Sequence, residues 1–263
     1  MANRKKTAAG SPAAKNQGRQ AGFPDLFRKV RRRLFHLCLL LIAGSMAITI
    51  AFRWVPVPCS SLMIQKRIAA FWQGDKDFRF RYRWVDLKKI SPYAHLAVIA
   101  SEDQKFLNHM GFDFDAIEKA WEHNQRKRKV HGASTISQQL AKNLFLWPQR
   151  SFVRKGLEVY FTLLLEGLWP KHRILEVYLN VAEFGPGIFG GEAASQTYFR
   201  KPAARLTSGE AALLAATLPS PQRFNPAKPS DYLRQRAGQI QQQMRQLGGP
   251  ASLRKPLGQA PSK

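Results

Sequence analysis

A run of nineteen residues without a formal charge, Leu34–Phe52, constrains this chain more than any other feature of its sequence. As an α-helix the run would rise about 1.5 Å per residue to roughly 28 Å, which is close to the thickness of a bilayer's hydrocarbon core. It has almost no polar face, which disfavours a helix buried in a soluble core. Basic residues precede it, at Arg28, Lys29, Arg31, Arg32 and Arg33. We therefore expect a transmembrane helix over 34–55, with the basic flank in the cytoplasm.

A cleaved signal peptide is the alternative for the same run. The apolar core of such a peptide is shorter and is followed by a site of small residues. Here the run begins only at Leu34, and no clear small-residue site follows Phe52. We favour a retained anchor that places Trp54 at the membrane interface and the later residues outside the cytoplasm.

The charge of the chain is strongly positive, because 42 Lys and Arg against 17 Asp and Glu give a formal net charge of +25. The first 33 residues hold ten of these basic residues and one acid, so the excess extends into the folded part. Nucleic acid, acidic lipid or a phosphorylated ligand are the partners that such a charge favours. Cys38 lies inside the apolar run, and we expect no disulfide between it and Cys59.

The remaining sequence divides by composition into a few regions. Residues 1–33 form a basic polar tail, 56–90 a membrane-proximal linker with an extended segment, 91–247 one mainly helical domain, and 248–263 a flexible tail. Within the linker, aromatic and arginine residues alternate strictly from Phe78 to Trp84. This pattern could grip single-stranded nucleic acid, but a half-buried edge strand with a solvated arginine face requires fewer assumptions, and we favour it.

From Tyr93 onward the periodicity predicts helices and no further strand of comparable strength. One of these helices has an apolar stripe formed by Ile174, Leu175, Tyr178, Leu179 and Ala182. The opposite side of the same helix is expected to carry Glu176, Asn180 and Glu183.

Two adjacent carboxylates, Glu102 and Asp103, follow the apolar segment 96–100. Desolvation raises the pKa of a carboxyl group at such a place towards the range useful in acid–base catalysis. Local capping or ion pairing explains the pair equally well from the sequence alone. His109 has no second histidine or cysteine at metal-ligand spacing, so we expect no protein-built metal site there.

A helix start is predicted at Thr135, since Thr135 and Gln138 have the spacing of a capping box. Lys142 follows one turn later. A glycine-containing loop that enters a helix N-terminus, with a lysine one turn on, also suits a phosphate group. The sequence alone supports helix capping and phosphate binding equally well as the role of this segment.

Glu158 enters the apolar run 159–165 behind a basic cluster that contains Arg150, Arg154 and Lys155. An ion pair between Arg154 and Glu158, one helical turn apart, is the simpler interpretation and contributes little stability. Two carboxylates in separate segments together with this cluster nevertheless suggest sugar transfer with a phosphate leaving group.

Four ordered motifs in this chain resemble those of family 51 peptidoglycan glycosyltransferases, over about residues 84–226. The first comprises Glu102, Asp103, Phe106, His109 and Gly111. The second comprises Gly132, Ser134, Thr135, Gln138, Gln139, Lys142 and Asn143. The third comprises Arg154, Lys155 and Glu158, and the fourth runs from Arg173 to Asn180. The segment 183–190 looks most like that of the monofunctional biosynthetic enzymes of proteobacteria.

The resemblance implies a mainly α, lysozyme-like domain, with a head lobe and a membrane-proximal jaw lobe, that polymerises lipid II in cell-wall synthesis. It assigns Glu102 as the base that takes the proton of the acceptor 4-hydroxyl, and Glu158 as the second catalytic carboxylate. Lys142 and Arg150, with Arg154 and Lys155, would hold the pyrophosphate, together with a bridging divalent cation, Mg²⁺ or Mn²⁺. The donor site would be shaped by Ser134, Thr135, Gln138, Gln139 and Asn143. Secondary roles would fall to Asp103, Phe106, His109, Gly111 and Asn180.

The same resemblance implies the partners and the location. Lipid II, the growing lipid-linked glycan, anionic membrane lipid and other cell-wall synthesis proteins are the expected partners, and nucleic acid is not. The location would be the bacterial inner membrane, with the catalytic domain in the periplasm. A lysozyme-like glycan hydrolase and a non-enzymatic basic membrane protein are the alternatives; the second predicts a steep salt dependence and no need for either glutamate.

Overall fold

The computed structural model describes residues 23–126, 133–254 and 257. The chain divides into two units, residues 1–45 and residues 46–263. Most of the expected basic tail, Gly132 and most of the residues after 254 lie outside the described part.

The first helix, α1 (Phe23–Ala51), contains the apolar run. An 18-residue window within Phe27–Ala51 has a mean hydropathy of 2.2, and the helix is long and apolar enough to cross a membrane. It is compatible with single-pass membrane anchoring, as the sequence predicts.

The unit from residue 46 on is mainly helical, which confirms the expected fold class. Its helices are α2 (Ser61–Trp72), α3 (Pro92–Glu102), α4 (Phe114–Arg126), α5 (Ile136–Phe145), α6 (Phe152–Leu168), α7 (Lys171–Val181), α8 (Gly191–Phe199), α9 (Ser208–Thr217), α10 (Asp231–Gln246) and α11 (Ala251–Arg254). Short 3-10 turns cover Leu87–Lys89 and Ala203–Arg205. Serine or threonine side chains accept a backbone N–H at the start of many helices, which stabilises each start by about 1 kcal/mol; they are Ser60, Ser91, Thr135, Ser151, Thr207 and Ser230.

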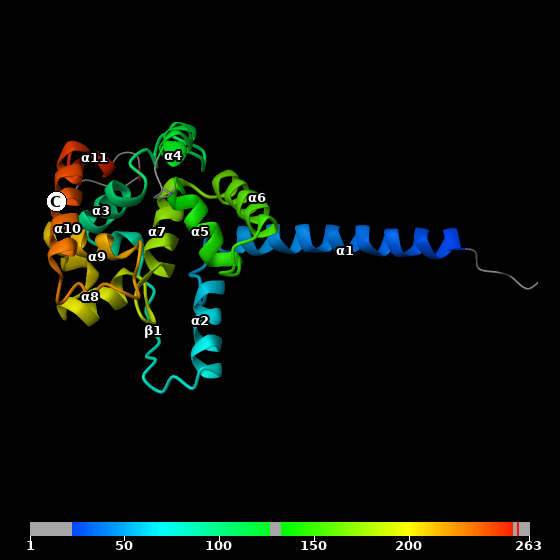
Figure 1. Cartoon of the computed structure of the whole chain (residues 1–263), viewed down its shortest axis with the longest axis horizontal. Coiled ribbons are helices and arrows are strands. Elements are labelled where there is room, and N and C mark those ends of the chain that lie inside the picture. Colours follow the sequence, from blue (N-terminus) through cyan, green and yellow to red (C-terminus); the bar gives the residue numbers. More distant parts are fainter. Residues whose placement is uncertain (1–22, 127–132, 255–256, 258–263) are drawn as a thin grey trace, which may run out of the picture. The chain divides into compact units, whose positions relative to one another are not determined.

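Helix α7 lies between two groups of helices (Figure 1). Helices α3, α9 and α10 pack against one another, and α5 packs against α2, α6 and α7. The stripe predicted on α7 is buried, but so is its other side, because Asn180 is fully buried there. Glu183 is not part of that helix, since α7 ends at Val181. The prediction of one polar face shared by Glu176, Asn180 and Glu183 is therefore wrong.

Three short strands form a sheet in the order β1-β3-β2. The edge strand β1 (Arg81–Tyr82) lies within the alternating segment; its aromatic residues are half-buried and its arginines are exposed, as predicted. The hairpin of β2 (Glu183–Gly185) and β3 (Ile188–Phe189) was not predicted, because strands of two or three residues are too short to show a period of two. A Cβ atom on Gly187 would lie 2.6 Å from the carbonyl oxygen of Arg79, so glycine lets β1 approach the hairpin.

The C-terminal part differs from the flexible tail expected after residue 247. The short helix α11 follows α10, and Leu253 and Leu257 are both buried in the core. Apolar burial thus continues past Gly248 and Gly249, into the segment 248–263 that the sequence predicts to be a flexible tail.

Asn180 clamps the segment after β1 to α7. Its Oδ1 accepts from the N–H of Val85 at 2.9 Å, and its Nδ2 donates to the carbonyl oxygens of Val85 and Glu176 at 2.9 and 2.8 Å. We expect Asn180→Ala to lower the free energy of unfolding by about 2–3 kcal/mol, because three hydrogen bonds at a buried position are lost. Chemical denaturation of the detergent-solubilised chain measures this. Exposed Gln246→Ala is the control and should change stability by less than about 0.5 kcal/mol; equal effects of the two variants would show that the clamp contributes nothing.

Candidate active site

Asp103 joins the end of α3 to the start of α5. It is buried, and its carboxylate contacts His109 Nε2 at 2.9 Å and accepts the backbone N–H of Ile136 at 3.0 Å. Ile136 is the first residue of α5, where the helix dipole favours a negative charge. The N–H of Gly111 donates to His109 Nδ1 at 3.1 Å, which assigns the ring proton to Nε2. Asp103 therefore has a structural partner on each side.

The cap of α5 is the predicted capping box. Thr135 Oγ1 accepts the N–H of Gln138 at 3.2 Å, and Gln138 Oε1 accepts the N–H of Thr135 at 3.0 Å. The Thr135 hydroxyl also donates to the carbonyl oxygen of Gly111 at 2.7 Å. Phe106 is fully buried in the same frame, with the Lys171 ammonium 4.6 Å from its ring centre. Thr135, Gly111 and Phe106 therefore support the site without lining its two cavities, whereas Gln138 supports the site and also lines one of them.

Glu102 ends α3 half-buried, with its carboxylate held from two directions. It accepts from Ser101 Oγ at 3.0 Å and from Gln139 Nε2 at 2.9 Å. Gln139 Oε1 in turn accepts from the Tyr178 hydroxyl at 2.9 Å. Burial, followed by the charges of Glu102 and Asp103, raises the pKa of Tyr178 well above its usual value, so the phenol stays protonated and donates. Tyr178 thus fixes the Gln139 amide, and the amide fixes Glu102.

The sequence pattern predicts Tyr178 only as part of an apolar stripe and does not reveal this role. The signal that could have revealed it is the hydroxyl itself, since a fully buried tyrosine normally needs a hydrogen-bond partner.

A cavity of about 410 Å³ lies beside Gln139 and is strongly cationic. It is lined by Ser134, Gln138, Gln139, Lys142, Pro148, Arg150, Arg154, Lys155 and Glu158. Glu158 is buried and pairs with Arg154 Nη1 at 3.0 Å and Lys155 Nζ at 2.5 Å. The expected ion pair between Arg154 and Glu158 is therefore present, and it is part of the cavity wall.

The positive charge of this cavity exceeds what its own carboxylate can neutralise. Burial, and then the charges of Arg154, Lys155 and Arg150, lower the pKa of Lys142, although Glu158 opposes the shift. Arg154 Nε is buried without a hydrogen-bond partner in the described part of the chain. A buried unpaired donor beside several cations is the environment that an anionic ligand such as a phosphate stabilises.

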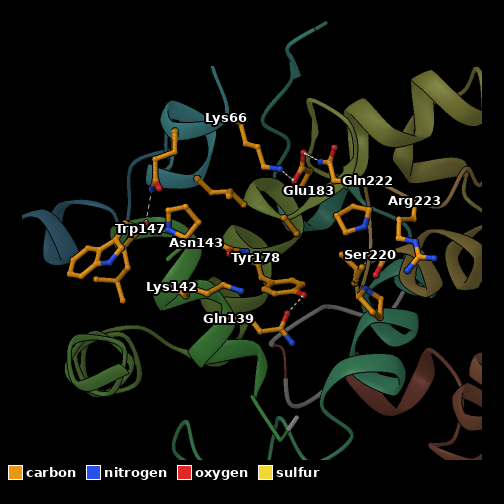
Figure 2. A pocket seen from close by; sticks show the side chains of 18 residues that line it. Lys66, Gln139, Lys142, Asn143, Trp147, Tyr178, Glu183, Ser220, Gln222 and Arg223 are labelled. Carbon is orange, nitrogen blue, oxygen red and sulfur yellow. Dashed lines mark hydrogen bonds and ion pairs between the residues drawn. The ribbon is translucent and has the colours of Figure 1, made fainter. Parts of the chain in front are cut away.

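A second cavity, of about 480 Å³, adjoins the first and shares Gln139, Lys142 and Pro148 with it. Figure 2 shows Gln139 and Tyr178 at one end and the charged cluster of Lys66, Glu183 and Gln222 at the other. Lys66 Nζ lies 3.5 Å from Glu183 Oε2, and Gln222 Nε2 donates to Glu183 Oε1 at 2.5 Å. Burial raises the pKa of Glu183, although Lys66 opposes this shift. No sequence pattern predicts this cluster, because its residues come from α2, the hairpin and the segment after α9, which are far apart in sequence.

Some of the predicted site residues line the two cavities, and others support the site from outside them. The cationic cavity contains all the predicted pyrophosphate ligands, while Asn143 lines the second cavity. Glu102 lines neither cavity, but it contacts Gln139, which lines both. Asn180 belongs to the clamp at Val85 and not to either cavity.

No group of three or more His, Cys, Asp and Glu residues that could hold a metal ion occurs within residues 23–126, 133–254 and 257. Glu158 is the one carboxylate that lines the cationic cavity there. A divalent cation at this site would therefore take most of its ligands from a bound phosphate group or from water.

Comparisons with known proteins show what this chain is similar to. Residues 69–245 match the transglycosylase family. A biosynthetic peptidoglycan transglycosylase of Pasteurella multocida is 52% identical over 224 residues, which cover 85% of this chain and 91% of that protein. Proteins with the same name from Xanthomonas axonopodis pv. citri and Klebsiella oxytoca are 50% identical over 239 residues and 53% identical over 230 residues. These matches cover 91% and 87% of this chain and 97% and 94% of those proteins.

Gly111 is required by the frame that joins Asp103 to α5. Its φ is +87°, and an added Cβ would lie 2.7 Å from Thr162 Cγ2. We expect Gly111→Ala to destabilise the chain by about 1–3 kcal/mol, since it combines backbone strain with a steric clash. Denaturant unfolding measures the change. Gly238→Ala, in α10 with no atom within 4 Å of the new Cβ, should instead be neutral or stabilising by up to about 1 kcal/mol. Equal stability of the two variants would contradict the account of this loop.

Proposed function

The chain belongs to the transglycosylase family, and we propose that it polymerises lipid II into the β-1,4-linked glycan strands of peptidoglycan, with release of undecaprenyl pyrophosphate. The observation that carries this proposal is the link from Glu102 through Gln139 to a cavity with four basic side chains. Sugar transfer from a pyrophosphate donor needs a base for the acceptor and cations for the leaving group. Both requirements have candidate residues here.

In the proposed reaction, the carboxylate of Glu102 accepts the proton of the acceptor sugar's 4-hydroxyl. The hydroxyl oxygen attacks the donor anomeric carbon from the face opposite the pyrophosphate, so that a new C–O bond forms as the bond to phosphate breaks and the configuration inverts. Proton transfer by a positioned carboxylate contributes about 10²–10⁴-fold to such a rate. The hydrogen bonds from Ser101 and Gln139 orient the carboxylate for this role.

The departing pyrophosphate would be held by Lys142, Arg150, Arg154 and Lys155. Charge-assisted bonds to phosphate contribute about 1.5–3 kcal/mol each when water is excluded. Glu158, between Arg154 and Lys155, would set the positions of these cations. Without that carboxylate the basic side chains would repel one another.

Two neighbouring cavities suit a polymerase, because each cycle joins two lipid-linked substrates. We assign the donor's pyrophosphate to the cationic cavity and the sugar of the second substrate to the cavity that contains Lys66 and Glu183. Gln139, in the wall between them and bonded to Glu102, lies where the two substrates would meet.

A divalent cation, Mg²⁺ or Mn²⁺, fits this site only if it binds together with the substrate. It would neutralise charge on the pyrophosphate oxygens, as such ions do in other phosphate-transfer sites. Glu158 is the protein carboxylate that could reach it, although Arg154 and Lys155 already bind that group.

The proposed location is the bacterial inner membrane, with α1 spanning once and the catalytic unit in the periplasm. Anionic membrane lipid and other cell-wall synthesis proteins are the proposed partners besides the substrate and the growing glycan. A glycan hydrolase with the same fold remains the competing function, but hydrolysis gives the cationic cavity no role.

The topology can be tested with a reporter fused after Lys263. The basic cluster before the apolar run predicts that the N-terminus stays in the cytoplasm, so an alkaline phosphatase fusion should be active. A green fluorescent protein fused at the same position should be non-fluorescent. The reverse pattern would contradict both the topology and the use of an externally displayed substrate.

The phosphate cavity can be tested through Lys142→Ala and Arg150→Ala. Each should abolish most glycan synthesis and weaken binding of a phosphoglycolipid inhibitor by about tenfold or more, since each removes a charge-assisted contact of about 1.5–3 kcal/mol. Exposed Lys228→Ala is the matched control. Because the pKa of Lys142 is lowered, the affinity for the inhibitor should decline at a lower pH than it would with an ordinary lysine. Lys142→Arg should move that decline to higher pH. Unchanged affinity in both alanine variants would refute the assignment.

The catalytic base can be tested with Glu102→Gln. Turnover on lipid II should fall about 10²–10⁴-fold, while inhibitor binding survives because glutamine keeps the size of the side chain. Glu158→Gln should reduce turnover and also weaken inhibitor binding, because the cations of its cavity lose their partner. Asp103→Asn should lower the melting temperature, since an amide cannot accept from both His109 and Ile136 in the same way. An active Glu102→Gln beside a folded but inactive Asp103→Asn would show that the base is misassigned.

A further inference from the structure

A third cavity, of about 570 Å³, lies where the chain leaves α1. Arg53 and Trp54, which line it, follow the last helical residue, Ala51, by two and three positions. The helix end from Met46 on belongs to the same compact unit as the cavity. Trp54 is 69% exposed, as aromatic residues at a membrane interface commonly are. If α1 crosses the bilayer, this cavity opens at the depth of the lipid headgroups, a layer about 5–8 Å thick on each side.

Arg173, in the wall of the cavity, is hydrogen-bonded to the segment that follows α1. Its guanidinium donates to the carbonyl oxygens of Phe52 and Val55 at 2.7 and 2.5 Å and lies 5.0 Å from the ring centre of Trp84. It also pairs with Glu176 Oε2 at 2.5 Å. Arg173 therefore uses its donors within the protein and serves as a wall of the cavity rather than as a ligand.

Both acids in the lining are already engaged. Glu176 accepts from Arg173 and from the backbone N–H of Leu87 at 2.8 Å. Asp86 pairs with Lys89 at 2.9 Å, and the hydrogen bond from Lys89 is the main reason that the pKa of Asp86 is lowered. The negative charges of the cavity are thus neutralised by neighbours.

Lys88 and His172 are different, because neither makes an ion pair or a side-chain hydrogen bond within the described residues. Both are exposed, and both line the cavity. A cavity with engaged acids, an available ammonium and an available imidazole, next to an exposed tryptophan, suits an anion that carries an apolar part.

We propose that this cavity binds the phosphate of an anionic phospholipid in the leaflet at which α1 ends. Lys88 and His172 donate to the phosphate, and Trp54 packs against the glycerol and upper acyl chains. The proposal rests on the membrane anchoring stated under the proposed function, but it concerns a site separate from the two substrate cavities. A bound lipid would hold the catalytic unit at a fixed height above the membrane surface.

The test uses the full chain in a neutral detergent and native mass spectrometry. The probes are short-chain phosphatidylglycerol, phosphatidylcholine of the same chain length, and inorganic phosphate. The double variant Lys88→Gln/His172→Gln removes the proposed ligands, and Lys228→Gln/Arg205→Gln removes surface charge elsewhere. We expect wild type and control to retain one phosphatidylglycerol, and the site variant to bind it at least about tenfold more weakly.

Equal phosphatidylglycerol affinity in all three proteins would overturn the proposal. So would phosphatidylcholine binding as tight as that of phosphatidylglycerol, or inorganic phosphate binding as tight as that of the lipid. Lipid II polymerisation is measured separately on the same samples. A wild type that binds phosphatidylglycerol but does not polymerise would count against the proposed function and leave the lipid site standing.

Discussion

The hydrogen bonds of one buried carboxylate, that of Asp103, hold the candidate active site together. They join His109 to the first turn of α5, across 33 positions of sequence between Asp103 and Ile136. Because α5 starts there, its first turn brings Gln139 against Glu102 and its second turn brings Lys142 into the cationic cavity. The two adjacent carboxylates thus have different surroundings: that of Asp103 is bonded to His109 and Ile136, and that of Glu102 to Ser101 and Gln139.

The second constraint is electrostatic. Lys142, Arg150, Arg154 and Lys155 surround a cavity in which Glu158 is the carboxylate of the lining. Like charges at such distances repel, and burial of Lys142 adds a desolvation penalty that its lowered pKa reflects. This arrangement of cations does not stabilise the fold. It would, however, preorganise the site electrostatically for a pyrophosphate leaving group. The apolar frame around α7 supplies the stability that offsets it.

Local patterns predicted the local features. The capping box of Thr135 and Gln138, the half-buried alternation at 78–84 and the pairing of Arg154 with Glu158 each depend on residues within a few positions, so spacing reveals them. Tyr178, the cluster of Lys66 and Glu183, and the clamp of Asn180 on Val85 could not be read in this way, since each joins segments far apart in sequence. The hairpin at 183–189 was missed because its strands, of three and two residues, are too short to show a period of two. The grouping of the motif residues into one functional site came from the family resemblance, and the structure added which of them line a cavity.

The measurement that tests the central claim most directly compares synthesis with degradation in one purified preparation. The full-length chain in detergent is given lipid II in one reaction and preformed peptidoglycan sacculi in another, and glycan length is followed in both. The account predicts long glycan strands from lipid II, with release of undecaprenyl pyrophosphate, and no shortening of sacculi. Shortened sacculi without any growth from lipid II would contradict it, because the cationic cavity would then have no leaving group to hold.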